Sequence, residues 1–196
     1  MKETTAVIIL AAGNSSRLGK PKQLLPYKNT TLLKHTVSQV LLLPDSIVIV
    51  VTGSNTELIQ KELKNQKVTH CYNPDWENGM STSIIEGLKA VLNLTPHIQK
   101  CIFAVCDQPY VTVSVFEDLI SEYEKSGKGI IASAYSETVG TPVLFDKKYF
   151  NQLLELKGQE GAKKIIIRFT EDTASIPFEK GAIDIDTIED YNNVIN

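Results

Sequence analysis

Residues 6–22 read Ala6-Val7-Ile8-Ile9-Leu10-Ala11-Ala12-Gly13-Asn14-Ser15-Ser16-Arg17-Leu18-Gly19-Lys20-Pro21-Lys22, an apolar run followed by a small-residue turn with basic side chains. The β-branched run is typical of a buried strand. The glycines and serines that follow it let backbone N–H groups approach phosphate oxygens. We therefore expect a strand that leads into a phosphate-binding loop.

The same alternation of apolar runs and helical patterns continues along the chain. Further strands are predicted at 47–51, 68–72, 101–106 and 129–134, and helices at 31–43, 56–63, 81–94 and 114–124. This order is typical of βαβ units, whose ligands bind at the carboxyl ends of the strands. The sequence thus predicts an α/β fold, a Rossmann-like three-layer sandwich with a mostly parallel central sheet.

The last third changes in character but contains no linker. We expect a strand at 142–145, helices at 147–156 and 162–169, a short strand at 174–176 and a closing helix at 187–196. Since no low-complexity tract or repeat interrupts the chain, residues 1–196 are expected to form a single domain.

Composition argues against polyanionic and membrane partners. The net charge is -3, with 20 basic and 23 acidic residues well mixed, which offers no basic patch for nucleic acid. The early apolar run is too short for a signal-peptide core or a spanning helix, so we expect a cytoplasmic protein.

Cysteines and histidines form no recognisable site. Buried thiols are expected rather than a metal or redox centre, and Cys101 and Cys106 should face opposite sides of a strand because their separation is odd. No histidine has a spaced partner, so surface or capping positions are expected for His35, His70 and His97.

The glycine loop is neither of two common nucleotide-binding motifs. Pro21 stands where a Walker A loop needs Ser or Thr, and GxGxxG is absent. Arg17 offers a planar fork for bidentate phosphate contacts, whereas Lys22 offers a compact charge. Both residues suit phosphoryl transfer, although a simple solvated loop would have a similar composition.

Carboxylates at two places could bind a metal ion. Asp107 ends the strand predicted at 101–106, which places it where an α/β sheet meets its ligand, or it caps the following turn. Asp184 and Asp186 share one face if the segment is extended. Alternatively, Asp186 caps the terminal helix.

A second ligand loop is expected at residues 73–83, which read NPDWENGMSTS and open a helix. The free N–H groups of a helix N-terminus can receive an anion or a base edge. Plain helix capping by Ser81 is the alternative.

LAAGNSSRLGKPK, residues 10–22, matches every fixed position of LAAGxSxRxGxxK and so resembles the molybdenum cofactor nucleotidyltransferases and related sugar-phosphate nucleotidyltransferases. The resemblance implies Mg²⁺-assisted transfer of a nucleoside monophosphate from a nucleoside triphosphate, with release of pyrophosphate. It implies catalytic roles for Arg17, Lys22 and Asp107, and metal binding by Asp107 with Asp186, or else Asp184. It further implies a nucleotide site formed by Leu10, Ala11, Ala12, Gly13, Arg17, Lys22, Gly79, Met80, Ser81 and Asp107.

Finer details of the resemblance favour the cytidylyltransferase branch. AAG, PKQLLP, CDQP and DIDTxEDY imply CTP and molybdopterin as substrates, with the pterin phosphate attacking the α-phosphate to form molybdopterin cytosine dinucleotide for a molybdoenzyme. Segments 140–145 and 156–162 resemble the acceptor side, but Gln159 departs from the Asp that is usual there. GTP, or a sugar phosphate or other small acceptor, is one alternative; a non-catalytic carrier or insertion factor for the molybdenum cofactor is another.

Overall fold

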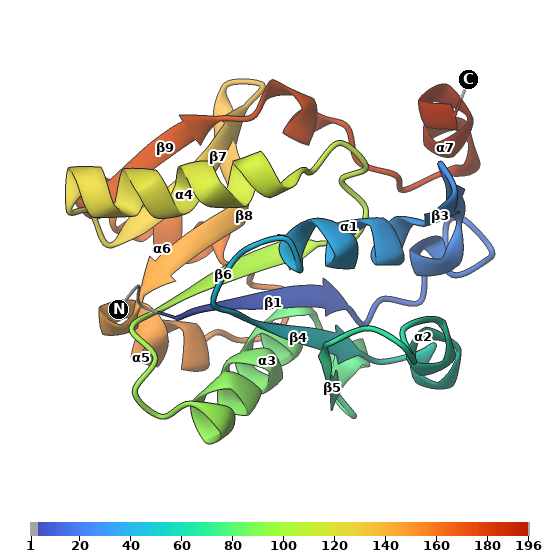
Figure 1. Ribbon diagram of the computed structural model, residues 1–196, viewed down its shortest axis with the longest axis horizontal. Helices are drawn as coiled ribbons and strands as arrows, with labels where there is room; N and C mark the ends of the chain where they lie inside the picture. Colours follow the sequence, from blue (N-terminus) through green and yellow to red (C-terminus); the bar gives the residue numbers. More distant parts are fainter. Residues whose placement is uncertain (1–3, 196) are drawn as a thin grey trace.

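The computed structural model describes residues 4–195, which form a central sheet covered by helices on both faces (Figure 1). The strand order is β5-β4-β1-β6-β8-β7-β9, and β8 is antiparallel to both of its neighbours. The other pairs are parallel, so the expected mostly parallel sheet is confirmed. The bounds are β1 (Thr5–Ala11), β4 (Ser46–Thr52), β5 (Thr69–Tyr72), β6 (Lys100–Val105), β7 (Ile130–Tyr135), β8 (Thr138–Asp146) and β9 (Thr173–Pro177).

Alternation along β1 divides the core into two layers. Val7 and Ile9 pack in one cluster with residues of α1 and α4, whereas Ala6 and Ile8 pack in another with residues of α3, α5 and α6. The expected three-layer sandwich is therefore present. The helices are α1 (Leu32–Val40), α2 (Thr56–Glu62), α3 (Met80–Leu94), α4 (Val113–Ser126), α5 (Phe150–Leu154), α6 (Lys163–Arg168) and α7 (Ile188–Ile195).

The order in which strands join the sheet reverses at β1, and this reversal indicates where a ligand can bind. After β1 the chain adds β4 and β5 on one side, then crosses to place β6 on the other side. The loops that follow the neighbouring parallel strands β1 and β6 lie together at the carboxyl edge of the sheet, where an open α/β fold usually binds its ligand.

Several boundaries in the last third differ from expectation. The strand expected at 142–145 begins at Thr138, because Ser136 and Glu137 adopt positive φ and join β7 to β8 in a tight hairpin. Two-residue hairpin turns usually contain glycine, so Ser136 and Glu137 did not indicate a hairpin in the sequence. The helix expected at 147–156 is a 3-10 turn (Lys147–Tyr149) followed by the short α5. In the closing helix, the expected position 196 lies outside the described residues.

A small hairpin was not expected from the sequence. It pairs β2 (Pro26–Tyr27) with β3 (Thr30–Thr31), and α7 packs against it. The Tyr191 hydroxyl donates a hydrogen bond to the Pro26 carbonyl at 2.7 Å. Figure 1 shows α7 beside β3, so the end of the chain returns to the segment that follows the glycine loop.

Cys101 and Cys106 are buried as expected, whereas Cys71 is only half-buried and one histidine lies elsewhere than expected. Cys101 and Cys106 are buried in opposite core layers, and burial raises the pKa of the Cys106 thiol to about 12. His35 was expected at the surface or at a cap, yet its side chain is buried against Tyr27 and its Nε2 lies 3.1 Å from the Val111 carbonyl. None of the helices within residues 4–195 has the length and hydropathy needed to cross a bilayer.

Close packing of α3 on the sheet predicts a strict size limit at Gly87. A Cβ there would lie 2.5 Å from Ile8 Cγ2 and 2.9 Å from Val51 Cγ2. We expect Gly87→Ala to lower the free energy of unfolding by about 1–3 kcal/mol through overpacking, despite a gain in helix propensity of about 1 kcal/mol. Urea unfolding measures this change. The exposed Asn93→Ala on the same helix is the control, and equal stability of the two variants would contradict the expected clash.

Candidate active site

A cavity of about 400 Å³ opens at the carboxyl edge of β1 and β6. It lies at the point where the sheet topology predicts a ligand. Its wall includes most of the residues that the sequence assigned to a nucleotide: Leu10, Ala11, Ala12, Gly13, Lys22, Gly79, Met80 and Asp107. The wall also contains side chains that the sequence did not single out, namely Asn14, Gln23, Trp76, Glu77, Ser83, Val105, Cys106 and Gln159, the last noted only as a departure from the family pattern.

Ser15 and Gln23 hold the glycine loop in shape. The Ser15 carbonyl accepts hydrogen bonds from the N–H groups of Leu18 and Gly19, and its hydroxyl oxygen accepts one from the N–H of Lys22. The Gln23 amide donates to the carbonyls of Ala11 and Gly13 at 2.9 and 2.8 Å. A polar residue next to Lys22 carries no periodic signal, so sequence patterns could not reveal this contact.

Lys22 joins the loop to both predicted carboxylate positions. Its Nζ lies 2.6 Å from Asp107 Oδ2 and 2.8 Å from Asp186 Oδ1. The Lys22 side chain is only 17% exposed, so solvent screens these two ion pairs weakly. Three positions separated by up to 164 residues in sequence therefore meet at one ammonium group.

The electrostatics keep this cluster charged. Burial alone would lower the pKa of Lys22, but Asp107 and then Asp186 outweigh it and hold that pKa above its usual value. Burial likewise opposes ionisation of Asp186, yet Lys22 and Arg17 hold the pKa of Asp186 below its usual range. At neutral pH Lys22 is therefore an ammonium and Asp186 a carboxylate.

Asp186 does not cap the terminal helix. Thr187 and Asp190 make the capping contacts, since Asp190 N donates to Thr187 Oγ1 while Thr187 N donates to Asp190 Oδ2. The Asp186 carboxylate is thereby left for the site, where Arg17 Nη2 also contacts it at 2.6 Å. Arg17 itself is 68% exposed at the rim, and Asp184 is exposed nearby.

A hard cation fits the oxygen donors of this cluster. Asp107 and Asp186 already approach one positive group, that of Lys22, from two sides. Mg²⁺ is commonly held by one or two carboxylates together with substrate phosphates, rather than by a closed protein cage. Within residues 4–195, no group of three or more Asp, Glu, His or Cys side chains could hold a metal ion.

The loop at residues 73–83 contributes to the opposite wall. Gly79 has a φ of 114°, and its Cβ would collide with the backbone of Gly158, so glycine is required there. Asn73 is fully buried and donates to the hydroxyls of Thr82 and Ser83. These contacts fix the start of α3 beside the cavity.

Ser81 makes a structural contact beside the cavity. It was expected to contact the nucleotide, but it does not line the cavity, and its hydroxyl donates to the Gly158 carbonyl at 2.8 Å. Ser83 lines the cavity instead. The motif alone could not separate the two serines, because both lie in the first turn of α3.

A second, mostly apolar cavity of about 250 Å³ adjoins the first. The two share Leu10, Met80 and Val105. The second is also lined by residues from both segments that resembled an acceptor side, namely Gly140, Thr141, Gly161 and Ala162. Gln108 lies close by and donates to the carbonyls of Thr141 and Gly181.

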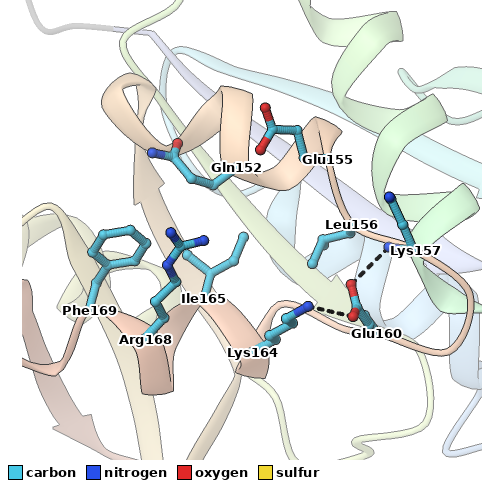
Figure 2. Close-up of a pocket in the computed structure, with 9 residues that line it drawn as sticks. All are labelled: Gln152, Glu155, Leu156, Lys157, Glu160, Lys164, Ile165, Arg168 and Phe169. Atoms are coloured by element: carbon cyan, nitrogen blue, oxygen red, sulfur yellow. Dashed lines mark hydrogen bonds and ion pairs between the residues drawn. The ribbon is translucent and has the colours of Figure 1, made fainter.

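Another cavity, of about 390 Å³, lies between α5 and α6, outside this site (Figure 2). Figure 2 shows Glu160 bonded to the N–H of Lys157 and paired with Lys164. Neither Asp107 nor Asp186 reaches it. The turn that contributes Lys157 and Glu160 to this cavity also contributes Gln159 to the active-site cavity.

Comparison with known proteins assigns the family. Residues 7–173 match the model of the MobA-like NTP transferase domain. The chain belongs to this family. It is accordingly a nucleotidyltransferase, an enzyme whose substrate is a nucleoside triphosphate.

Individual relatives of this nucleotidyltransferase carry different names. It is 25% identical to the molybdenum cofactor cytidylyltransferase of Escherichia coli, over 94% of this chain and 92% of that protein. It is 26% identical to the nicotine blue oxidoreductase of Paenarthrobacter nicotinovorans, over 93% and 92%.

Solved structures confirm the fold. Rv0371c from Mycobacterium tuberculosis superposes with a TM-score of 0.85 at 26% identity, covering 100% of this chain and 99% of that one. A manganese complex of Rv0371c superposes with a TM-score of 0.82 at 22% identity, again covering 100% and 99%.

The Thr187–Asp190 cap predicts a remote effect on the site. Asp190→Ala removes the acceptor for the N–H groups of Asp186 and Thr187, so we expect the Asp186 carboxylate to become mobile and nucleotidyl transfer to slow on the order of tenfold. Steady-state kinetics measure this. Glu189→Ala removes the same charge from the same turn without removing a cap and should leave the rate near wild type; equal losses would mean that charge, not capping, matters.

Proposed function

We propose that this nucleotidyltransferase uses CTP and molybdopterin, forming molybdopterin cytosine dinucleotide and pyrophosphate. The observation that carries the proposal is the meeting of Lys22 with Asp107 and Asp186 at the mouth of a cavity lined by the glycine loop. The choice of cytidine is supported by the motifs AAG, PKQLLP, CDQP and DIDTxEDY and by likeness to the Escherichia coli cytidylyltransferase.

The loop N–H groups, Arg17 and Lys22 would each contact the triphosphate in a different way. The backbone N–H groups of the glycine loop face phosphate oxygens, while Arg17 at the rim offers a fork and Lys22 a mobile point charge. Lys22 can exchange a carboxylate partner for a phosphate without losing its charge compensation. The protein thus aligns the pterin phosphate for in-line attack on the α-phosphate, and no covalent intermediate is required.

Asp107 and Asp186 would hold the divalent cation, with Asp184 as the second choice. When bound, Mg²⁺ neutralises charge on the α-phosphate and on the leaving pyrophosphate. Manganese is a reasonable substitute, because Rv0371c has been solved as a manganese complex.

The adjoining apolar cavity is the proposed acceptor site. Its wall contains Tyr135, Val139 and Ile166. It also contains Leu10 and Met80, which line the nucleotide cavity as well. An apolar wall with few polar groups suits a flat heterocycle such as a pterin.

Pyrophosphate release tests the proposal directly. CTP, GTP, ATP and UTP are each supplied with Mg²⁺, with and without molybdopterin, and the pterin product is identified by mass. We expect release only with CTP plus pterin. A preference for GTP would indicate guanylyl transfer instead of cytidylyl transfer. Pyrophosphate release with a sugar phosphate in place of pterin would indicate that the acceptor is a sugar phosphate. Tight nucleotide binding without turnover would favour a cofactor carrier, and oxidoreductase activity on nicotine blue would match the second relative instead.

Removing the shared charge separates chemistry from fold. Lys22→Met should lower kcat/KM on the order of 100-fold or more, because the developing phosphate charge loses its compensation. Lys20→Met removes a neighbouring exposed lysine that contacts neither carboxylate and should remain within about twofold of wild type. Steady-state rates of both folded variants measure the contribution of Lys22. Full activity of Lys22→Met would show that Lys22 has no role in catalysis.

A further inference from the structure

Gln23 lies directly after Lys22, and both residues line the active-site cavity. The Gln23 side chain is 1% exposed and turns beneath the glycine loop. Both hydrogens of its amide are used, one on the Ala11 carbonyl and one on the Gly13 carbonyl. Its own carbonyl oxygen has no hydrogen-bond partner among residues 4–195. A buried acceptor without a partner is costly, so the two donated bonds are the evident reason for an amide at this position.

These two bonds determine where the loop N–H groups point. In a trans peptide the carbonyl of one residue and the N–H of the next point in opposite directions. Because Gln23 holds the carbonyls of Ala11 and Gly13 towards its own amide, the N–H groups of Ala12 and Asn14 are directed away from that amide. Neither N–H donates to another residue in the described part of the chain.

The peptide between them is held separately. The Ala12 carbonyl accepts a hydrogen bond from the N–H of Ser54, in the loop after β4. Gln23 and Ser54 therefore restrain successive peptide planes of one short turn. Such a set of preorganised amide donors is a receptor for anions.

We propose that Gln23 is a positioning residue, whose amide aims the N–H groups of Ala12 and Asn14 at the triphosphate. This inference rests on the proposed binding of a nucleotide in the cavity. A methionine at position 23 fills the same space without donors, and a glutamate presents a carboxylate to two carbonyls. Neither can replace the amide.

Isothermal titration calorimetry of Gln23→Met tests the proposal with CTP, inorganic triphosphate and cytidine as separate probes. Affinity for CTP and for triphosphate should each fall on the order of tenfold, which corresponds to about 1.4 kcal/mol. Affinity for cytidine should not change. The control is Ser133→Ala, which removes another buried hydrogen bond to a carbonyl, that of Pro142, in β7. It should lower the melting temperature but leave every affinity unchanged.

A second measurement uses the wild-type protein, so that it does not depend on folding of a variant. Addition of inorganic triphosphate should shift the backbone amide resonances of Ala12 and Asn14, with that of Gly127 as a remote reference. Unchanged affinities in folded Gln23→Met, or binding that moves neither amide, would overturn the positioning role. Failure of wild-type protein to bind CTP or triphosphate would instead overturn the proposed function on which the role rests.

Discussion

The ammonium group of Lys22 is the contact on which the active site depends. Asp107 and Asp186 both approach within hydrogen-bonding distance of it, and two carboxylates so close together would repel one another without a cation between them. Since the lysine is little exposed, water cannot take over this role. The glycine loop, the end of β6 and the approach to α7 are thus joined by charge as well as by packing.

The glycine loop, the end of β6 and the segment before α7 are brought together by different features of the fold. Ala11 and Asp107 lie near each other because β1 and β6 are neighbouring parallel strands that end at the same edge. Asp186 arrives through packing: Ile185 is fully buried with Tyr191 and the β2–β3 hairpin, and its N–H donates to the Asp107 carbonyl. A single buried residue between two acidic ones thereby fixes the second carboxylate beside the first.

Reaction type within this family is a property of side chains rather than of the scaffold. Relatives of nearly equal identity are named a cytidylyltransferase and an oxidoreductase, although both align over almost the whole chain. On this scaffold the present chain carries a glycine loop, a lysine shared by two carboxylates and an apolar cavity next to them. These features suit transfer of a nucleoside monophosphate to the phosphate of an acceptor that packs against an apolar wall.

Local patterns in the sequence determined the main strands and helices, the order of the βαβ units and the glycine loop, because hydrophobic periodicity and small residues act over short distances. They also marked Lys22, Asp107 and Asp186, whose residue types and positions at element ends are visible without a structure. Tertiary structure alone decided which serine faces the cavity, that Thr187 rather than Asp186 caps α7, and that Gln23 holds the loop from below. Each of these depends on the direction of a side chain towards a group distant in sequence or across a turn, and one-dimensional patterns carry no such directions.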